Sequence, residues 1–234
     1  MVDLSLGLPE AISSAKRRSP WTAGPNVRRV ASDPLEVRLL DIAGSLGLLI
    51  FFLPLMLIIA ASVYIADPGP VLFRQRRLGR GGRYFWCYKF RTMATDAEAR
   101  LAQLLARDAA ARFEWQRDQK LRNDPRVVGI GLFLRKSSLD ELPQLWNILK
   151  GEMSLVGPRP IVEDERSRYG KYIRHYCSVR PGLTGLWQIS GRNDVSYRRR
   201  VAFDVIYARR CCVRDNLRIL LMTVPSVLGS RGSY

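Results

Sequence analysis

The stretch IAGSLGLLIFFLPLMLIIAASVYIA, residues 42–66, decides how this chain folds. It is almost wholly apolar, is bounded by Asp41 and Asp67, and has Pro54 near its middle. A helix needs roughly 20 apolar residues to cross a hydrocarbon core of about 30 Å, so this stretch is long enough. A buried helix of a soluble core is the other interpretation, but such a helix seldom needs so long an uninterrupted run. The sequence therefore predicts a membrane-embedded helix.

Arginines flank this stretch on both sides, and their positions bear on its orientation in a membrane. The nearest ones are Arg28, Arg29 and Arg38 before it, then Arg74, Arg76, Arg77, Arg80 and Arg83 after it. Since positive residues favour the cytoplasmic side, basic flanks at both ends favour a re-entrant helix-break-helix, bent at Pro54. A straight-through helix with a mild proline kink also fits, because membranes tolerate one. These features leave both topologies open.

Charge and cysteine content narrow the classes of function. The chain has 234 residues and a formal net charge of +17, from 38 Lys and Arg against 21 Asp and Glu. This excess implies an anionic partner: nucleic acid, an anionic membrane leaflet or a phosphorylated substrate. Four cysteines without a CxxC pair, and a single His, argue against a zinc site. Adjacent Cys211 and Cys212 make a poor disulfide framework, which favours a reducing compartment.

The chain divides into three expected segments. Residues 1–33 are rich in Pro, Ser, Gly and Arg, which predicts a flexible basic arm. Residues 34–67 form the membrane-embedded segment, and residues 68–234 a cytoplasmic domain that carries the function. The expected fold class is α/β and mostly helical, with amphipathic helices at the membrane interface and one short β-hairpin.

Regular structure in the cytoplasmic domain is predicted from turn residues and apolar spacing. Residues 71–93 indicate a short β-hairpin, because three glycines between positions 79 and 82 mark a turn and an aromatic-rich strand follows. Apolar residues at spacings of three to four predict one helix over about 96–117, with Asp96 at its capped start. Residues 216–228 predict a further apolar, interfacial helix.

Two adjacent acids, Asp140 and Glu141, stand out in LRKSSLDELPQLWNILKGEMSLVGPRP, residues 134–160. Ser138 and Glu141 match a capping box, with Ser at the N-cap and Glu at the third helical position. A helix N-terminus is also an anion site, so the same geometry suits phosphate chemistry. Neighbouring residues on a helix point about 100° apart, so the two acids cannot share one task. These residues alone leave capping and chemistry both open.

Basic residues beside glycine and proline turns strengthen the case for chemistry. They occur in the motifs YKFRTM, LRK, GPRP, VRPGLTG and SGRN, and they are Lys89, Arg91, Arg135, Arg159, Arg180 and Arg192. Each one alone is typical of a solvated surface charge. Together they predict a site for a pyrophosphate, whose oxygens guanidinium groups bind in a bidentate manner.

At these residues the chain resembles the bacterial sugar transferases, the monotopic phosphoglycosyl transferases. The matching pieces are YKFRTM (88–93), DPRVVGIGLFLRKSSLDELPQLWNILKGEMSLVGPRP (124–160) and VRPGLTGLWQISGRN (179–193). The resemblance runs from about Pro34 to Leu228, and its motifs are long and specific. The chain is most similar to the short members that start exopolysaccharide repeat units with a galactosyl or glucosyl phosphate.

The resemblance implies a reaction and assigns residues to it. UDP-sugar and polyprenyl (undecaprenyl) phosphate would give polyprenyl-diphosphate-sugar and UMP. By position, Asp140 corresponds to the proposed nucleophile and Glu141 to the acid linked to Mg²⁺. The basic residues that the family motifs assign to the site correspond to Lys89, Arg91, Arg135 and Arg159.

The resemblance also implies a location and partners. The family's membrane segment is a re-entrant hairpin bent at a proline, which corresponds to Pro54. The chain would lie in the bacterial inner membrane, with its catalytic domain on the cytoplasmic face. Its expected partners are UDP-sugar, polyprenyl phosphate and inner-membrane lipids. A homodimer and the identity of the sugar are left open.

A membrane-tethered nucleic-acid-binding domain without catalysis is the alternative that the net charge supports. It leaves the acid pair and the proline turns unexplained, and the sequence contains no recognised nucleic-acid module. Nucleic acid is therefore not an expected partner.

Overall fold

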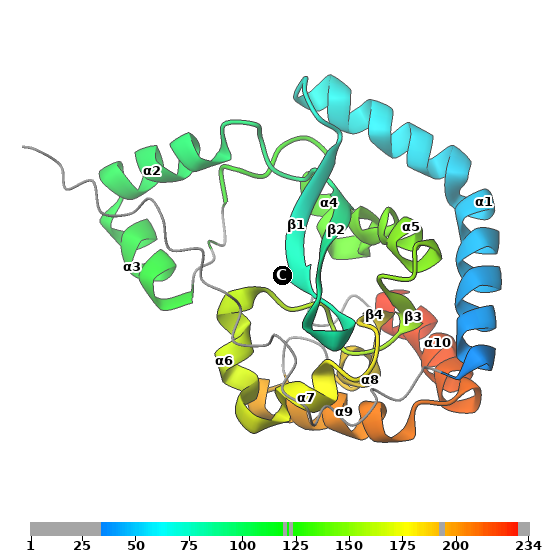
Figure 1. Ribbon diagram of the computed structural model, residues 1–234. Helices are drawn as coiled ribbons and strands as arrows, with labels where there is room; N and C mark the ends of the chain where they lie inside the picture. The colour runs from blue at the N-terminus through cyan, green and yellow to red at the C-terminus, as the bar shows by residue number, and fades with distance from the viewer. Residues whose placement is uncertain (1–33, 119–120, 122–123, 192–194, 229–234) are drawn as a thin grey trace, which may run out of the picture. The chain divides into compact units, whose positions relative to one another are not determined.

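Figure 1 shows the computed structural model, which describes residues 34–118, 121, 124–191 and 195–228. The predicted basic arm, residues 1–33, and the predicted phosphate ligand Arg192 lie outside these ranges. Within them the chain is mostly helical with a few short strands, as predicted.

The apolar stretch forms the helix α1, Leu35–Ala66, which has 32 residues and contains Pro54. Figure 1 shows α1 changing direction partway along its length. Secondary structure is continuous through Pro54, so the predicted helix-break-helix is one bent helix rather than two. Proline removes one backbone hydrogen bond and bends a helix, while the remaining bonds keep it intact.

The length and composition of α1 suffice to cross a membrane. Its most apolar window has a mean hydropathy of 2.7, and only 11% of that window is buried within the protein. Large apolar side chains in its middle face outward, among them Ile50, Phe51, Leu53, Leu57 and Ile58. A soluble core helix would bury such side chains, so their exposure agrees with the predicted membrane embedding.

Both ends of α1 pack against the rest of the chain. Near its start, Arg38 donates hydrogen bonds to the carbonyls of Ile148 (2.7 Å) and Leu149 (2.8 Å). Near its end, Ile59 and Val63 belong to a buried cluster. The other members of that cluster are Phe90 and Leu134. The same body of structure therefore holds both ends of the apolar helix.

The predicted hairpin is present as strands β1, Leu72–Leu78, and β2, Tyr84–Phe90, paired antiparallel. The turn contains the short 3₁₀ helix η1, Arg80–Gly82, in which Gly81 (φ 67°) and Gly82 (φ 74°) have left-handed backbones. Glycine adopts this conformation without steric cost, which is why the glycine cluster predicted the turn correctly.

A second two-stranded sheet was not predicted. It pairs β3, Ser154–Val156, in parallel with β4, Gly182–Thr184. Where β4 begins and β3 has just ended, two backbones touch: a Cβ added at Gly182 would lie 2.0 Å from the backbone nitrogen of Gly157. Only glycine permits this approach. The approach brings the GPRP and PGLTG motifs together, although they lie more than 20 residues apart.

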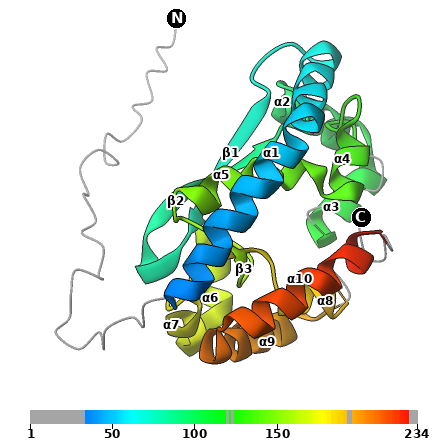
Figure 2. The same cartoon turned by 90° about the vertical axis from the view of Figure 1, so that its right-hand side faces the viewer.

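The remaining helices surround these strands (Figures 1 and 2). They are α2 (Ala97–Arg107), α3 (Ala109–Asp118), α4 (Gly131–Ser137), η2 (Leu139–Glu141), α5 (Gln144–Leu149), η3 (Glu163–Glu165), α6 (Arg166–Tyr169), η4 (Gly170–Tyr172), α7 (Ile173–Tyr176), α8 (Leu186–Ile189), α9 (Tyr197–Arg210) and α10 (Val213–Leu228). The apolar helix predicted over 216–228 is thus confirmed as the greater part of α10.

The single helix predicted over 96–117 is wrong, because the chain forms two helices separated at Asp108. Asp108 has an extended backbone, and its carboxylate accepts hydrogen bonds from the amides of Ala110 (2.8 Å) and Ala111 (3.0 Å). An aspartate that caps a new helix start in this way ends the preceding helix. Asp96, the predicted cap, instead pairs with Arg100 at 2.7 Å.

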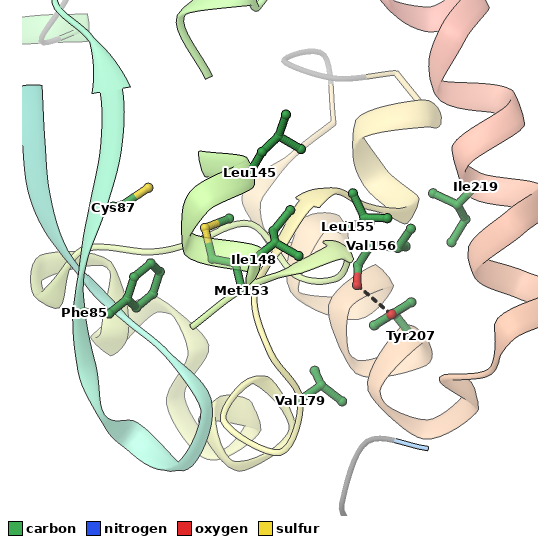
Figure 3. Packing of buried hydrophobic residues seen from close by; sticks show 10 residues of the cluster. All are labelled: Phe85, Cys87, Leu145, Ile148, Met153, Leu155, Val156, Val179, Tyr207 and Ile219. Atoms are coloured by element: carbon green, nitrogen blue, oxygen red, sulfur yellow. Dashed lines mark hydrogen bonds between the residues drawn. The ribbon is translucent and has the colours of Figure 1, made fainter. Parts of the chain in front are cut away.

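The main core, shown in Figure 3, packs side chains from β2, α5, β3, α9 and α10 against one another. Leu145 and Ile148 of α5 are fully buried in it, together with Val156 of β3. The hydroxyl of Tyr207 on α9 donates a hydrogen bond of 2.7 Å to the carbonyl of Val156. Truncating such a core leucine costs about 2–5 kcal/mol, so this packing holds these elements firmly in place.

Candidate active site

The acid pair lies in the 3₁₀ turn η2, between α4 and α5. The turn is entered through Ser138, which has a left-handed backbone (φ 59°) and makes no side-chain capping bond. The predicted capping box is therefore wrong. A left-handed residue other than glycine costs about 1–3 kcal/mol, and such residues cluster at functional sites. Here the conformation turns the chain sharply and frees Glu141 from the role of a helix cap.

Lys89 of β2 bridges the two carboxylates. Its Nζ lies 2.5 Å from Glu141 Oε1 and 3.6 Å from Asp140 Oδ2. Asp140 is 8% exposed, and its carboxylate accepts no hydrogen bond from the residues that the structure describes. One acid is thus tightly paired, whereas the other is buried and held only by charge.

This difference drives the pKa values of the two acids apart. Burial raises the pKa of Asp140, Glu141 raises it further, and Lys89, Arg135 and Arg159 offset only part of the rise. Burial also acts to raise the pKa of Glu141, but Lys89 and Arg159 outweigh it and hold that pKa below its usual range. Cations beside an acid ordinarily lower its pKa, but here burial outweighs them, so the pKa of Asp140 is raised.

Arg159 of the GPRP motif lines the same pocket as Lys89 and Glu141. Its side chain is exposed, and it makes no hydrogen bond or ion pair with any residue in the described ranges. Arg135 lies close enough to lower the pKa of Asp140, and its Nε donates to Thr92 Oγ1 at 2.9 Å. Of the predicted cations, Lys89, Arg135 and Arg159 gather around the acids.

Two other predicted cations lie elsewhere. Arg91 donates a hydrogen bond to the carbonyl of Asp67 and pairs with the carboxylate of the same residue at 3.3 Å. Arg180 donates to the carbonyl of Gly151 at 2.9 Å. Neither residue lines the pocket beside Glu141. Their role in phosphate binding stays a prediction, and their observed contacts join segments of the fold.

Arg77 lines the pocket, although the sequence pointed to it only as a membrane flank. It is held by the carbonyl of Pro160 (2.9 Å) and by Gln75 Oε1 (2.6 Å), and burial followed by Arg159 lowers its pKa. On the partner strand β2, a sequence pattern could have indicated a pocket residue. The alternation of Phe85, Cys87 and Lys89 places Lys89 on the inner face of the hairpin. No comparable pattern marked Arg77.

Two glutamines complete the pocket, and the sequence analysis missed both. Gln144 is 2% exposed, yet its side-chain amide makes no hydrogen bond with the described residues. Gln188 donates to the carbonyl of Leu183 at 3.2 Å, but its Oε1 is buried without a partner. Buried amides normally find partners, so the pocket offers neutral hydrogen-bonding groups beside its charges.

The acid pair can hold a magnesium ion only if the phosphate groups of the substrate supply further ligands to the same ion. Within the described ranges no three His, Cys, Asp or Glu side chains gather as a metal site. Mg²⁺, however, is usually held by one or two carboxylates together with substrate phosphates and water. The ammonium of Lys89 already lies between the two carboxylates, which shows that a positive charge is stable there.

Comparison with known proteins gives a family and several relatives. The family model described as bacterial sugar transferase matches residues 34–230. The undecaprenyl-phosphate galactose phosphotransferase of Salmonella typhimurium is 49% identical over 197 residues, which cover 84% of this chain and 41% of that protein. The exopolysaccharide production protein ExoY of Rhizobium meliloti is 50% identical over 197 residues, covering 84% of this chain and 87% of that protein.

A third relative is more distant. The UDP-glucose:undecaprenyl-phosphate glucose-1-phosphate transferase of Xanthomonas campestris is 39% identical over 214 residues, covering 88% of this chain and 40% of that protein. The chain thus spans less than half the length of several curated relatives that it matches, and most of the length of ExoY. Because the family model covers nearly all of the described residues, the chain belongs to the bacterial sugar transferase family.

Proposed function

We propose that this chain is a phosphoglycosyl transferase that moves a sugar-1-phosphate from a UDP-sugar to undecaprenyl phosphate and releases UMP. One observation carries the proposal: Asp140, a buried carboxylate with no hydrogen bond from the described residues, lies beside a cation-bound carboxylate and an arginine that pairs with none of those residues. The names of the relatives agree with this chemistry and with the first step of exopolysaccharide assembly.

In the first step Asp140 attacks the phosphorus that bears the sugar. A bond forms between a carboxylate oxygen and phosphorus, the phosphorus–oxygen bond to UMP breaks, and UMP leaves with the electron pair. A more basic carboxylate is the better nucleophile once it is ionised, so a raised pKa suits this role. Lys89 and Arg159 neutralise charge on the phosphate oxygens as UMP departs.

In the second step an oxygen of undecaprenyl phosphate attacks the same phosphorus. The new diphosphate bond forms, the bond to Asp140 breaks, and the free carboxylate returns. No net proton transfer is needed, which agrees with a site where the only described His, His175, does not line the pocket.

Glu141 is proposed to hold Mg²⁺ together with the diphosphate of the UDP-sugar. When bound, the ion would neutralise charge on the diphosphate. Because the pKa of Glu141 is lowered, this carboxylate is ionised and ready to bind a cation.

Chelation should abolish UMP release and added Mg²⁺ should restore it. Glu141→Gln should raise the Mg²⁺ concentration needed for half-maximal rate, and an unchanged Mg²⁺ dependence would contradict this role.

The function is tested by a UMP-release assay on the full chain in detergent or nanodiscs, with undecaprenyl phosphate and a panel of UDP-sugars. With at least one UDP-sugar, the wild-type enzyme should release UMP and the variant Asp140→Asn should not. Enzyme quenched with that UDP-sugar and no lipid should carry a hexose phosphate on the peptide containing Asp140. Direct transfer through a ternary complex, with no adduct, would remove the covalent step and leave Asp140 another role.

We also propose that residues 34–67 are re-entrant, so that the catalytic domain, residues 68–234, lies on the cytoplasmic face of the inner membrane. A spanning helix carries its ends to opposite faces of a core about 30 Å thick. In α1, Asp41 near one end bonds Ser154 and Leu155, while Asp67 at the other pairs with Arg91. Contacts at both ends with one domain favour the re-entrant arrangement.

Thiol labelling tests this topology. Leu35→Cys and Arg83→Cys, placed singly in a cysteine-free chain, mark exposed positions on either side of the apolar stretch. Both should resist a membrane-impermeant reagent in spheroplasts and react after lysis. Labelling of one position alone would show that the helix spans the membrane.

A further inference from the structure

Arg159 lines two separate hollows in the protein surface. The first is the pocket that contains Glu141 and Lys89. The second, which we name the aromatic hollow, has a volume of about 170 Å³. Its lining residues are Arg159, Ile161, Glu165, Tyr169, Trp187, Tyr197 and Arg200. The described reaction uses none of these side chains except Arg159.

The chemistry of the aromatic hollow suits a nucleobase. It combines three aromatic rings with two guanidinium groups, and Arg200 lies over the ring of Trp187 at 4.6 Å. Aromatic rings and guanidinium planes are the surfaces on which bases stack in proteins. The single acid, Glu165, already accepts a hydrogen bond from the amide of Val162 at 3.1 Å.

One polar atom in this region lacks a partner. The hydroxyl of Tyr197, at the start of α9, is buried and makes no hydrogen bond with the described residues. A buried hydroxyl left unpaired costs about 1–3 kcal/mol. A base carbonyl or a ribose hydroxyl bound in the hollow would remove that cost.

The direction of the reaction separates the nucleoside from Asp140. In phosphoryl transfer the attacking and leaving oxygens lie roughly in line with phosphorus. Asp140 attacks from its own side of the first pocket, so UMP leaves on the side away from it. Arg159 connects the two hollows and can therefore bind the diphosphate between them.

We propose that the aromatic hollow binds the nucleoside of the UDP-sugar, with Arg159 holding the diphosphate that joins it to the acid pair. This inference rests on the proposed function and locates one half of its substrate. The lipid substrate is a poorer occupant, because α1 packs mainly on α5, β3, α10 and β2 rather than on α6 or α9. A polyprenyl chain would have to cross a charged lining to reach the hollow.

The test uses inhibition of the full-length enzyme by UMP. Tyr197→Phe removes only the unpaired hydroxyl, so it should weaken UMP inhibition and raise the KM for UDP-sugar, each about five- to tenfold. The effect on kcat should be smaller, and inhibition by inorganic pyrophosphate should stay unchanged. Tyr172→Phe is the matched control, because Tyr172 is 42% exposed and lies outside both hollows.

Equal UMP inhibition in Tyr197→Phe and wild type would overturn the inference, as would an equal loss of UMP and pyrophosphate inhibition. A second measurement does not depend on this variant: photolabelling of wild-type enzyme with 5-azido-UDP. Label on peptides containing Trp187 or Tyr197 supports the inference, and label only elsewhere refutes it. Failure of the proposed function is distinct, since wild-type enzyme would then turn over no UDP-sugar.

Discussion

Asp140 beside the candidate active-site pocket and Asp41 on the apolar helix α1 are both buried aspartates, and they differ in their hydrogen bonds. Asp41 is 1% exposed and accepts hydrogen bonds from Ser154 Oγ and the Leu155 amide, each at 2.9 Å. Asp140 is 8% exposed and accepts none from the described residues. Since burying an acid without partners is costly, the hydrogen bonds of Asp41 stabilise the fold, whereas the carboxylate of Asp140 fits the proposed role in chemistry.

The surroundings of the two aspartates explain the difference. Asp41 lies where α1 crosses β3 so closely that a Cβ added at Gly44 would be 2.7 Å from Leu155 Cδ1. Asp140 lies in a strained turn beside a pocket whose cations attract phosphate. Substitutions at the two sites should therefore affect different measurements.

The largest effect is expected from Asp140→Asn. The amide keeps the shape of the side chain but cannot attack phosphorus, so kcat should fall at least about 10³-fold, or about 4 kcal/mol. Thermal stability should not fall, because Asp140 accepts no hydrogen bond within the described structure. A UMP-release assay measures kcat, and a melting curve measures thermal stability. Asp96→Asn, at an exposed helix start, is the control, and a similar rate loss there would refute the assignment.

Arg159→Lys should have the next largest effect. An ammonium lacks the bidentate fork of a guanidinium, so kcat/KM should fall about 10- to 100-fold, with normal stability. Arg180→Lys is the sharpest comparison, because Arg180 bonds the carbonyl of Gly151 and does not line the pocket. Arg180→Lys should lower the melting temperature, and its effect on kcat/KM should be small. Equal rate losses in the two variants would return Arg180 to the phosphate site.

Asp41→Ala should destabilise the protein by about 1–3 kcal/mol, because Ser154 Oγ and the Leu155 amide would be left buried without an acceptor. Asp41→Asn keeps one acceptor oxygen and should cost less. Thermal unfolding in detergent measures the difference, and turnover per folded molecule should be preserved. A variant that folds normally but loses turnover would show that Asp41 also serves the reaction.

The smallest effect concerns pH. Because Asp140 must be ionised to attack, kcat/KM should fall as pH drops through its pKa, which burial places above the usual value. Glu141 has a lowered pKa and stays ionised over that range. Lys89→Gln removes a cation that favours ionised Asp140, so the acidic limb should move to higher pH. A limb that stays in place or moves lower would show that another group controls the rate.

The same raised pKa has an opposite effect on stability. The folded protein binds a proton at Asp140 more readily than the unfolded chain does, so this group's contribution to stability falls as pH rises through its folded pKa. Asp140→Asn should remove this part of the pH dependence. Activity and stability thus respond to the ionisation of Asp140 with opposite signs.

Local features were predictable from sequence because their causes are local. Twenty-five almost wholly apolar residues specify a long helix for membrane embedding, and the left-handed glycines 81 and 82 specify the hairpin turn. The helix boundary at Asp108 was missed because an aspartate signals both a surface residue and a cap, and only the hydrogen bonds to the following amides distinguish the two.

By itself the sequence determined the long apolar helix, the hairpin and the identity of the motifs that carry acids and cations. Only the tertiary structure decided which cations reach the acids: Lys89, Arg135 and Arg159 do, whereas Arg91 bonds Asp67. It also decided that Lys89 pairs with Glu141 and that burial raises the pKa of Asp140. The physical reason is that electrostatic energy depends on distances between side chains and on their burial, and segments far apart in the chain set both.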